Sequence, residues 1–394
     1  MSAKRTFLKT SLNSIGALAV FMALFLNTAA QSNRKGLVNI VYSSDAHYGI
    51  NRKAFRGNNN VDAHLVNAAM ISQMNKLPKM ILPNDGGIGS GYKISSVDYV
   101  IQTGDIANRM EVPYQTAAKD WVEFNEDYIK SITLKAQDGQ PATLLLAPGN
   151  HDISNAVGYY KQMTLKTDPT AMVQMYNMML KPALLKTNSN YNFETDKINY
   201  SVNVNGVHLI FITLWPDSAE RIWMEKDLKK IQSKTPVIIF THDQPAVEAK
   251  HFTNPNGQHD INANDRFENL LAETYKDSHA ASDDFGNTEI EQRGFVAFLK
   301  KHPNIKAYFH GNSNWNEFYN YKGPDNDINL DVVRVDSPMK GKYSAKDEKL
   351  LSFQLISLDP ERKIMTVREC LWNTEPLNEL ESIKWGTSKT IILR

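Results

Sequence analysis

Short apolar runs recur along the chain, and most of them are followed directly by polar residues. β-branched and other apolar residues fill residues 37–43, 97–103, 143–147, 237–241 and 305–309. Runs of this length and composition predict buried strands. Between them, apolar residues recur at helical spacing in residues 61–76, 114–131 and 161–185. Strands that alternate with helices in this way predict an α/β layered domain.

The second half of the chain predicts further strands and one long insertion. Asn205-Gly206, a preferred dipeptide of two-residue hairpin turns, separates apolar residues 200–204 from 208–213. Residues 332–335, 352–357 and 363–369 predict an antiparallel set and therefore a second sheet. Residues 245–293 are polar and rich in asparagine, and they predict an insertion that passes over the site or forms a small cap. We therefore predict one domain at 37–370 and a C-terminal extension at 371–394.

The N-terminus has the pattern of an export signal. Lys4, Arg5 and Lys9 precede the apolar residues 15–26, and Thr28-Ala29-Ala30 supplies small residues for cleavage. We expect residues 1–30 to be removed, leaving a periplasmic or secreted protein without a stable membrane span; the alternative is an uncleaved anchor. Lysine stands in the first position of a motif that resembles the twin-arginine signal, so both that route and the ordinary secretory route stay open.

Composition narrows the function classes. The chain has 394 residues, 42% of them hydrophobic, which is ample for a large core and excludes a disordered protein. Its formal net charge is +1 and it has no long basic block after the N-terminus, so we expect no binding to a nucleic-acid polymer. Cys370 is the single cysteine, which excludes an internal disulfide.

Metal-binding residue types gather where the predicted strands end. The blocks are Asp45-Ala46-His47, Gly104-Asp105, Gly149-Asn150-His151-Asp152, Thr241-His242 and Gly311-Asn312-Ser313-Asn314. Each block alone is a weak signal, because such residues commonly occur in turns. Ligands of an α/β sheet bind at the carboxyl ends of its strands, so the blocks together predict a cluster of carboxylate, imidazole and amide groups.

The order of these blocks resembles the calcineurin-like metallophosphoesterase superfamily, in its exported bacterial form, over residues 37–368. The resemblance implies a four-layer αββα sandwich with two mixed sheets and a site for two divalent ions, drawn from Mn, Fe, Mg, Ca or Zn. By this resemblance Asp45, His47 and Asp105 would hold one ion. Asp105, Asn150 and His242 would hold the other.

The resemblance also implies the reaction and its partners. A metal-bridging hydroxide would attack a phosphomonoester or phosphodiester of a small phosphorylated substrate. His151 would stabilise or protonate the leaving oxygen, and Asp152 would orient its imidazole. Asn150 and His151 would contact the substrate, and Trp315 is close enough in sequence to stack on a substrate base.

The final block departs from the family pattern. The family has Gly-His-x-His, with both histidines as ligands, where this chain has Gly311-Asn312-Ser313-Asn314. The amide oxygens of Asn312 and Asn314 favour harder ions over zinc. The alternative function is a catalytically impaired relative that binds a phosphorylated or other ligand without turnover. His310 is expected on the opposite strand face as a packing residue.

Overall fold

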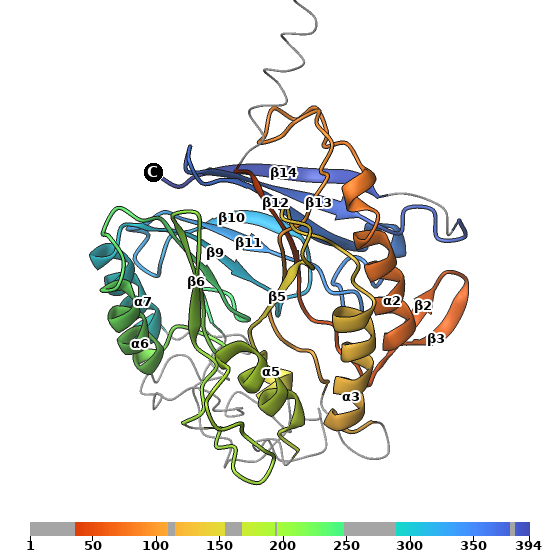
Figure 1. Ribbon diagram of the computed structural model, residues 1–394, viewed down its shortest axis with the longest axis horizontal. Coiled ribbons are helices and arrows are strands. Elements are labelled where there is room, and N and C mark those ends of the chain that lie inside the picture. Colours follow the sequence, from red (N-terminus) through yellow and green to blue (C-terminus); the bar gives the residue numbers. More distant parts are fainter. Residues whose placement is uncertain (1–35, 109–114, 154–167, 194, 248–288, 379–382) are drawn as a thin grey trace, which may run out of the picture. The chain divides into compact units, whose positions relative to one another are not determined.

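A computed structural model describes residues 36–108, 115–153, 168–193, 195–247, 289–378 and 383–394 (Figure 1). The chain divides into Met1–Leu37 and Val38–Arg394, and every described helix and strand lies in the second unit. The predicted signal at 1–30 and most of the predicted insertion, residues 248–288, lie outside the described residues. No helix within the described ranges is long and apolar enough to cross a membrane.

The first sheet is mixed and carries three of the predicted site blocks. Its strands are β1 (Val38–Ser43), β4 (Tyr99–Gln102), β5 (Thr143–Leu146), β12 (Ser352–Asp359), β13 (Ile364–Leu371) and β14 (Lys384–Ile392), in the order β14-β13-β12-β1-β4-β5. β1, β4 and β5 run parallel, whereas β12 to β14 add antiparallel strands on the other side of β1. β14 lies within residues 371–394, so the segment predicted as an extension contributes a strand to this sheet.

The second sheet carries the two remaining blocks. Its strands are β6 (Tyr200–Val204), β7 (Val207–Phe211), β8 (Val237–Phe240), β9 (Ile305–His310), β10 (Glu317–Tyr321) and β11 (Leu330–Arg334), in the order β10-β11-β9-β8-β7-β6. β7, β8, β9 and β11 are parallel, and β6 and β10 are antiparallel edges. The hairpin predicted at Asn205-Gly206 is confirmed. The predicted grouping of residues 332–335 with the C-terminal strands is wrong, because β11 pairs with β9 and β10.

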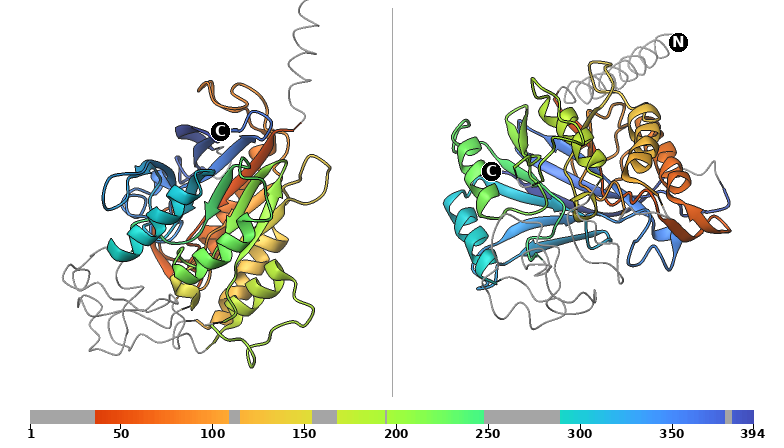
Figure 2. Two further views of the ribbon diagram at one scale, coloured as in Figure 1. Left: turned by 90° about the vertical axis from the view of Figure 1, so that its left-hand side faces the viewer. Right: turned by 90° about the horizontal axis from the view of Figure 1, so that it is seen from below.

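Helices cover both outer faces of the two sheets (Figures 1 and 2). α2 (Ala63–Met74) and α3 (Ala117–Phe124), which continues as the π-helical η2 (Asn125–Lys130), lie beside the first sheet. α6 (Ser218–Leu228) and α7 (Glu289–Lys301) lie beside the second sheet. The remaining elements are the hairpin β2 (Asn51–Phe55)–β3 (Asn58–Asp62), α4 (Asn150–Ile153), α5 (Thr170–Leu180), η1 (Leu77–Lys79) and η4 (Glu348–Leu350). This arrangement is the predicted αββα sandwich.

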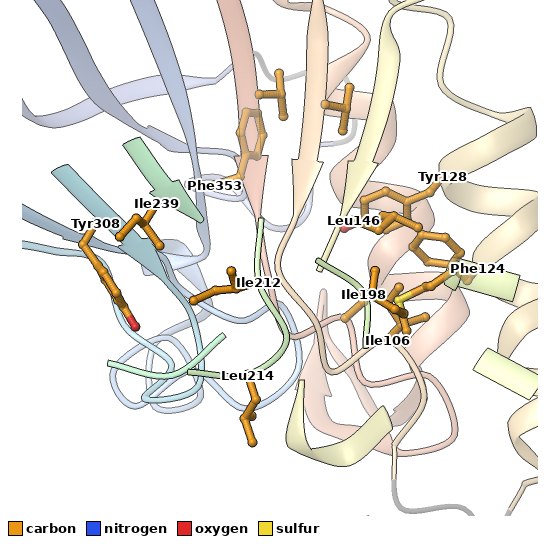
Figure 3. Packing of buried hydrophobic residues seen from close by; sticks show 14 of the residues in the cluster. Ile106, Phe124, Tyr128, Leu146, Ile198, Ile212, Leu214, Ile239, Tyr308 and Phe353 are labelled. Carbon is orange, nitrogen blue, oxygen red and sulfur yellow. The ribbon is translucent and has the colours of Figure 1, made fainter. Parts of the chain in front are cut away.

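Two hydrophobic clusters hold the layers together. Between the sheets, the buried rings of Tyr42, Phe240 and Phe309 meet at centroid distances of 4.7–5.7 Å. A second cluster reaches from the helices to the sheets, and Figure 3 shows Phe124 and Tyr128 packing toward Leu146. Rigid packing on both faces of the central strands fixes their carboxyl ends, where the site residues lie.

Candidate metal centre

Five loops converge at the carboxyl ends of β1, β4, β5, β8 and β9. Backbone hydrogen bonds join neighbouring loops: Asp45 N–H donates to the Gly104 carbonyl (2.9 Å) and His47 N–H to the Asp105 carbonyl (2.8 Å). In the second sheet, Gly311 N–H donates to the His242 carbonyl (3.0 Å). The strands β1, β4 and β5 are parallel to one another, as are β8 and β9, so each sheet brings its predicted ligands to one edge.

The side chains at this edge form two overlapping groups with the geometry of metal ligands. One comprises Asp45, Asp105 and His242, the other His47, Asp105 and His151, and the ligand atoms within each group lie within 4.8 Å of one another. Asp105 belongs to both groups: its Oδ2 is 3.6 Å from His47 Nε2, and its Oδ1 is 3.4 Å from His242 Nε2. All five side chains are buried. A shared carboxylate between two ligand groups is the arrangement that a bridged pair of ions requires.

Buried polar atoms in this cluster lack hydrogen-bond partners. They are Asp45 Oδ1 and both ring nitrogens of His47, and in the loop after β9 the Asn314 Oδ1 atom is likewise buried and unpaired. Buried polar atoms in folded proteins are almost always paired, so unpaired oxygen and nitrogen atoms at one place indicate a missing ligand. Carboxylate, imidazole and amide donors suit divalent ions, and the residues present therefore fit the predicted metals.

The charges of the cluster are mutually dependent. Burial raises the pKa of Asp105, but His151, His242 and His47 outweigh burial and hold that pKa well below its usual range. Burial lowers the pKa of His242, yet Asp105 and Asp45 outweigh burial and raise it to about 10. Burial and the positive charge of Lys340 lower the pKa of His47. Near neutral pH the His47 ring is therefore neutral and the His242 ring protonated.

The backbone at the ligand positions is in an uncommon conformation. Asp45, His47, Asp105, Asn312 and Asn314 all have φ between 45° and 64°, in the left-handed region. Residues with side chains adopt this region at a cost of about 1–2 kcal/mol, and such strain gathers at functional sites. Asparagine tolerates this conformation better than most residues, which is a local reason for Asn312 and Asn314 to fit their turns.

The block Gly149-Asn150-His151-Asp152 connects loops of the two sheets through hydrogen bonds. The Asn150 amide oxygen lies 3.1 Å from His242 Nε2, and the backbone N–H of His151 donates to Asp105 Oδ1 (2.8 Å). The Asp152 carboxylate accepts hydrogen bonds from the backbone N–H groups of Gly149 and Ala107, both at 2.9 Å. These contacts of Asp152 buttress the loops after β4 and β5. Its predicted role in orienting the His151 ring stays a prediction.

The two asparagines of the final block, Asn312 and Asn314, differ in the contacts of their side chains. Asn312 donates its backbone N–H to Asp45 Oδ2 (3.0 Å), but its amide group donates to Gln244 Oε1 (3.1 Å). Asn314 Oδ1 is buried without a hydrogen-bond partner, so of the two amides it has the oxygen that is free to accept a ligand. Trp315 has two cations over its ring, Arg334 at 3.7 Å and Lys342 at 4.0 Å from the centroid. A substrate base could stack there only by displacing one of them.

Two further side chains near the cluster are His310 and Lys340. His310 is buried, donates through Nδ1 to the Gly311 carbonyl and accepts through Nε2 from the Tyr319 hydroxyl, both at 2.9 Å, as expected of a packing residue. Lys340 was not predicted as a site residue, although its Nζ lies 3.5 Å from His151 Nε2. Lys340 lies five residues beyond the predicted strand at 332–335 rather than directly after it, so the strand-end pattern did not indicate it.

The fold and the cluster together define a metallophosphoesterase. The chain matches the calcineurin-like phosphoesterase family over residues 39–325, and it belongs to that family. Members of this family are metal-dependent phosphoesterases that typically bind two divalent ions. A comparison with curated proteins found no match.

The similar solved structures are distant in sequence. A dimetal phosphatase from Danio rerio is 9% identical with a TM-score of 0.50, covering 91% of this chain and 99% of that one. Vps29 carrying D62A from Entamoeba histolytica is 8% identical with a TM-score of 0.32, covering 89% and 97%. The calcineurin-like phosphoesterase YfkN from Bacillus subtilis is 12% identical with a TM-score of 0.30, covering 90% of each chain. The first of these supports the fold alone.

Proposed function

We propose that this chain is an exported hydrolase of small phosphomonoesters or phosphodiesters that works with two divalent ions. The observation that carries the proposal is the buried group around Asp105, in which ligand atoms of Asp45, His47 and His242 face one another without complete pairing. Asp45, His47, Asp105, Asn150, His242 and Asn314 would hold the ions, with Asn312 as a further donor if its amide leaves Gln244. When bound, the ions would act as Lewis acids that activate water and neutralise phosphate charge.

The chain's own residues supply the remaining chemistry. His151 is buried at the edge of the cluster, with Nε2 3.7 Å from Asp105 Oδ2, and its backbone is fixed by the hydrogen bond to Asp105. In this position it would donate a proton to the leaving oxygen of the ester, which is the usual work of a positioned imidazole. Asn150 would contact the substrate from the same loop, and Asp152 would keep that loop rigid.

Replacing His151 tests the assignment of the acid. His151→Ala is expected to lower kcat by about 100-fold or more, since general acid catalysis commonly contributes 10²–10⁴-fold. The metal content, measured by elemental analysis, is expected to stay at the wild-type value. Although His151 lies in one of the two groups, we propose it as the acid, and Asp45 Oδ1, 3.6 Å from His47 Nε2, would complete the ligand set of His47 and Asp105. His64→Ala is a matched control: His64 lies on α2 with a partly exposed ring, and its Nδ1 pairs with Asp127 of η2 (3.0 Å) rather than with a residue of the cluster. Unchanged turnover in His151→Ala would show that another group protonates the leaving oxygen.

A second function is favoured by one observation. The Asn312 amide pairs with Gln244, so the family's final ligand pair is only partly replaced. A protein with a weakened second metal site could bind a phosphorylated ligand without turnover. Elemental analysis with hydrolysis assays under added Mn²⁺ separates the two: two ions with turnover support the hydrolase, and phosphate binding without turnover supports the binding protein.

Export rests on the N-terminal pattern alone. Lys4, Arg5 and Lys9 followed by an apolar stretch and Thr28-Ala29-Ala30 support it. Sequencing the N-terminus of the natural protein is expected to give Gln31 or a close neighbour as the first residue. An N-terminus that retains residues 4–9 on a membrane-bound protein would support the uncleaved anchor.

A further inference from the structure

We propose that Lys340 contacts the phosphoryl group of the substrate and directs the site toward phosphomonoesters; this rests on the proposed hydrolase function. Lys340 Nζ lies 3.5 Å from Nε2 of His151, the proposed acid, and 3.2 Å from Asn108 Oδ1. Its side chain is partly buried, and its charge lowers the pKa of His47 across the cluster. A fixed cation therefore stands beside the groups that would surround the scissile phosphate.

The backbone of Lys340 is bound to a proposed metal ligand through one serine. The buried Ser337 hydroxyl donates to the Asp45 carbonyl oxygen (2.9 Å) and accepts from the backbone N–H groups of Met339 (3.1 Å) and Lys340 (3.0 Å). Met339 is also buried. The position of the lysine relative to Asp45 is thus set by two successive hydrogen bonds and by packing.

One buried charged side chain, Arg52, holds the rest of this turn, residues 337–344. The buried guanidinium of Arg52 donates to the carbonyl oxygens of Pro338 (2.7 Å) and Ser344. Gly341 follows Lys340 directly, and a Cβ there would lie 1.8 Å from Ser344 Oγ and 2.4 Å from Asp336 Oδ1. A turn with this many specific contacts presents Lys340 in one place, as electrostatic preorganisation requires.

A cation in this place distinguishes between the two ester classes. Near neutral pH a phosphomonoester carries up to two negative charges on three terminal oxygens, whereas a diester carries one charge on two. An ammonium group acts as a compact point charge that binds phosphate oxygens. The additional charge and oxygen of a monoester would therefore gain most from Lys340, and a diester would gain little.

The test compares Lys340→Gln with Lys346→Gln, which removes the same charge from an exposed position six residues along. Steady-state kinetics with an aryl phosphomonoester and an aryl phosphodiester are expected to show a loss of kcat/KM of about 100-fold for the monoester in Lys340→Gln, the size of effect seen when one preorganised donor is removed. The loss for the diester is expected to be about 3-fold or less, and Lys346→Gln is expected to match the wild type. Lys340→Arg, which keeps the charge, is expected to restore part of the monoester rate.

A second readout does not depend on turnover. Orthophosphate binding to the metal-loaded protein, measured by calorimetry, is expected to weaken at least about tenfold in Lys340→Gln at unchanged metal content. Equal losses on both esters, or unchanged phosphate affinity, would overturn the role of Lys340. Loss of metal in Lys340→Gln would also overturn it, because it would mean that the turn merely supports Asp45. A wild type that hydrolyses neither ester would refute the hydrolase, and phosphate affinity would still decide whether Lys340 contacts phosphate.

Discussion

His242 illustrates how a ligand's protonation depends on its neighbours. Its Nδ1 donates to the Thr103 carbonyl (2.6 Å), and its Nε2 faces Asn150 Oδ1 at 3.1 Å and Asp105 Oδ1 at 3.4 Å. Burial opposes its positive charge, but Asp105 and Asp45 raise its pKa to about 10. In the metal-free protein at neutral pH, Nε2 therefore carries a proton and has no lone pair to offer a metal.

Metal binding should release this proton, so affinity should rise with pH. We expect the Mn²⁺ association constant to increase by up to about tenfold per pH unit between pH 7 and 9, because one proton must leave His242. The lowered pKa of His47 leaves that ring neutral over this range, so it adds no further proton. Calorimetric titration in buffers with different protonation enthalpies would measure both the affinity and the protons released.

The raised pKa of His242 also makes the stability of the metal-free protein depend on pH. The pKa of His242 is about 10 in the folded protein and about 6.5 in the unfolded chain. The protonated ring therefore stabilises the metal-free fold fully below about pH 6.5, and this contribution is lost as the pH rises through about 10. His242→Gln should remove the pH dependence of both quantities, although it also removes a ligand. A Mn²⁺ affinity of the natural protein that does not change between pH 7 and 9 would contradict the assignment of His242 as a ligand.

Contacts between site side chains could be predicted from the sequence only for residues that directly follow a recognisable apolar strand. Asp45, Asp105 and His242 directly follow apolar strands, and the structure brings all three together. The engagement of Asn312 with Gln244 depends on the rotamers of two amides from different strands, which no spacing reveals. Lys340 lies in a turn held by Ser337 and was missed, because a lone lysine in a polar segment is usually only a solvated charge.

At the scale of elements, the loops approach so closely that glycine is required. A Cβ on Gly311 would lie 2.0 Å from Ser44 Oγ and 2.2 Å from Asp45 Oδ2, distances that no real contact allows. Gly311→Ala should therefore displace the Asp45 carboxylate while β9 and β1 remain formed. We expect loss of at least one metal ion and of turnover with an unchanged circular dichroism spectrum.

Gly139→Ala is the control for this substitution. Gly139 has φ of +82° with nothing within 4 Å of an added Cβ, so alanine there meets backbone strain alone. We expect Gly139→Ala to cost about 1–2 kcal/mol of stability and to retain its metals. Full metal content and activity in Gly311→Ala would show that the loop after β9 can shift away from Asp45.

The strands differ in how well their residues predicted them. β1, β4, β8 and β9 are largely buried on both faces, so continuous apolar runs identify them, and the edge strand β5 is buried at its carboxyl end, Leu145 and Leu146. The hairpin of β2 and β3 was missed because Asn58–Asp62 is largely exposed and polar. β14 is a mostly exposed edge strand rich in lysine, threonine and serine, and it was left in an extension. β11 was identified as a strand but placed in the wrong sheet, because its pairing with β9 is a tertiary property.

At the scale of the molecule, the proposed metal centre lies where loops of the two sheets meet. Asp45 and Asp105 follow strands of the first sheet, whereas His242 and Asn312 follow strands of the second. Direct hydrogen bonds cross between the loops of the two sheets, among them those from Asn312 N–H to Asp45 Oδ2 (3.0 Å) and from His242 Nδ1 to the Thr103 carbonyl (2.6 Å). The inter-sheet core that includes Tyr42 and Phe240 leads up to these loops. Ions bound here would add further links between the two halves of the sandwich.

Removing metal should therefore lower the stability of the entire fold. A ligand that binds only the native state at 100 times its Kd stabilises that state by about 2.7 kcal/mol. We expect Mn²⁺ to raise the melting temperature measured by calorimetry, and EDTA to reverse the increase, in one cooperative transition that includes both sheets. Asp105→Asn should melt at the same temperature with Mn²⁺ or EDTA, because Asp105 belongs to both ligand groups. If the natural protein also melts at the same temperature with Mn²⁺ and with EDTA, the proposed ligand side chains do not bind ions in the native state. The chain would then have the fold of the family without its metal ions.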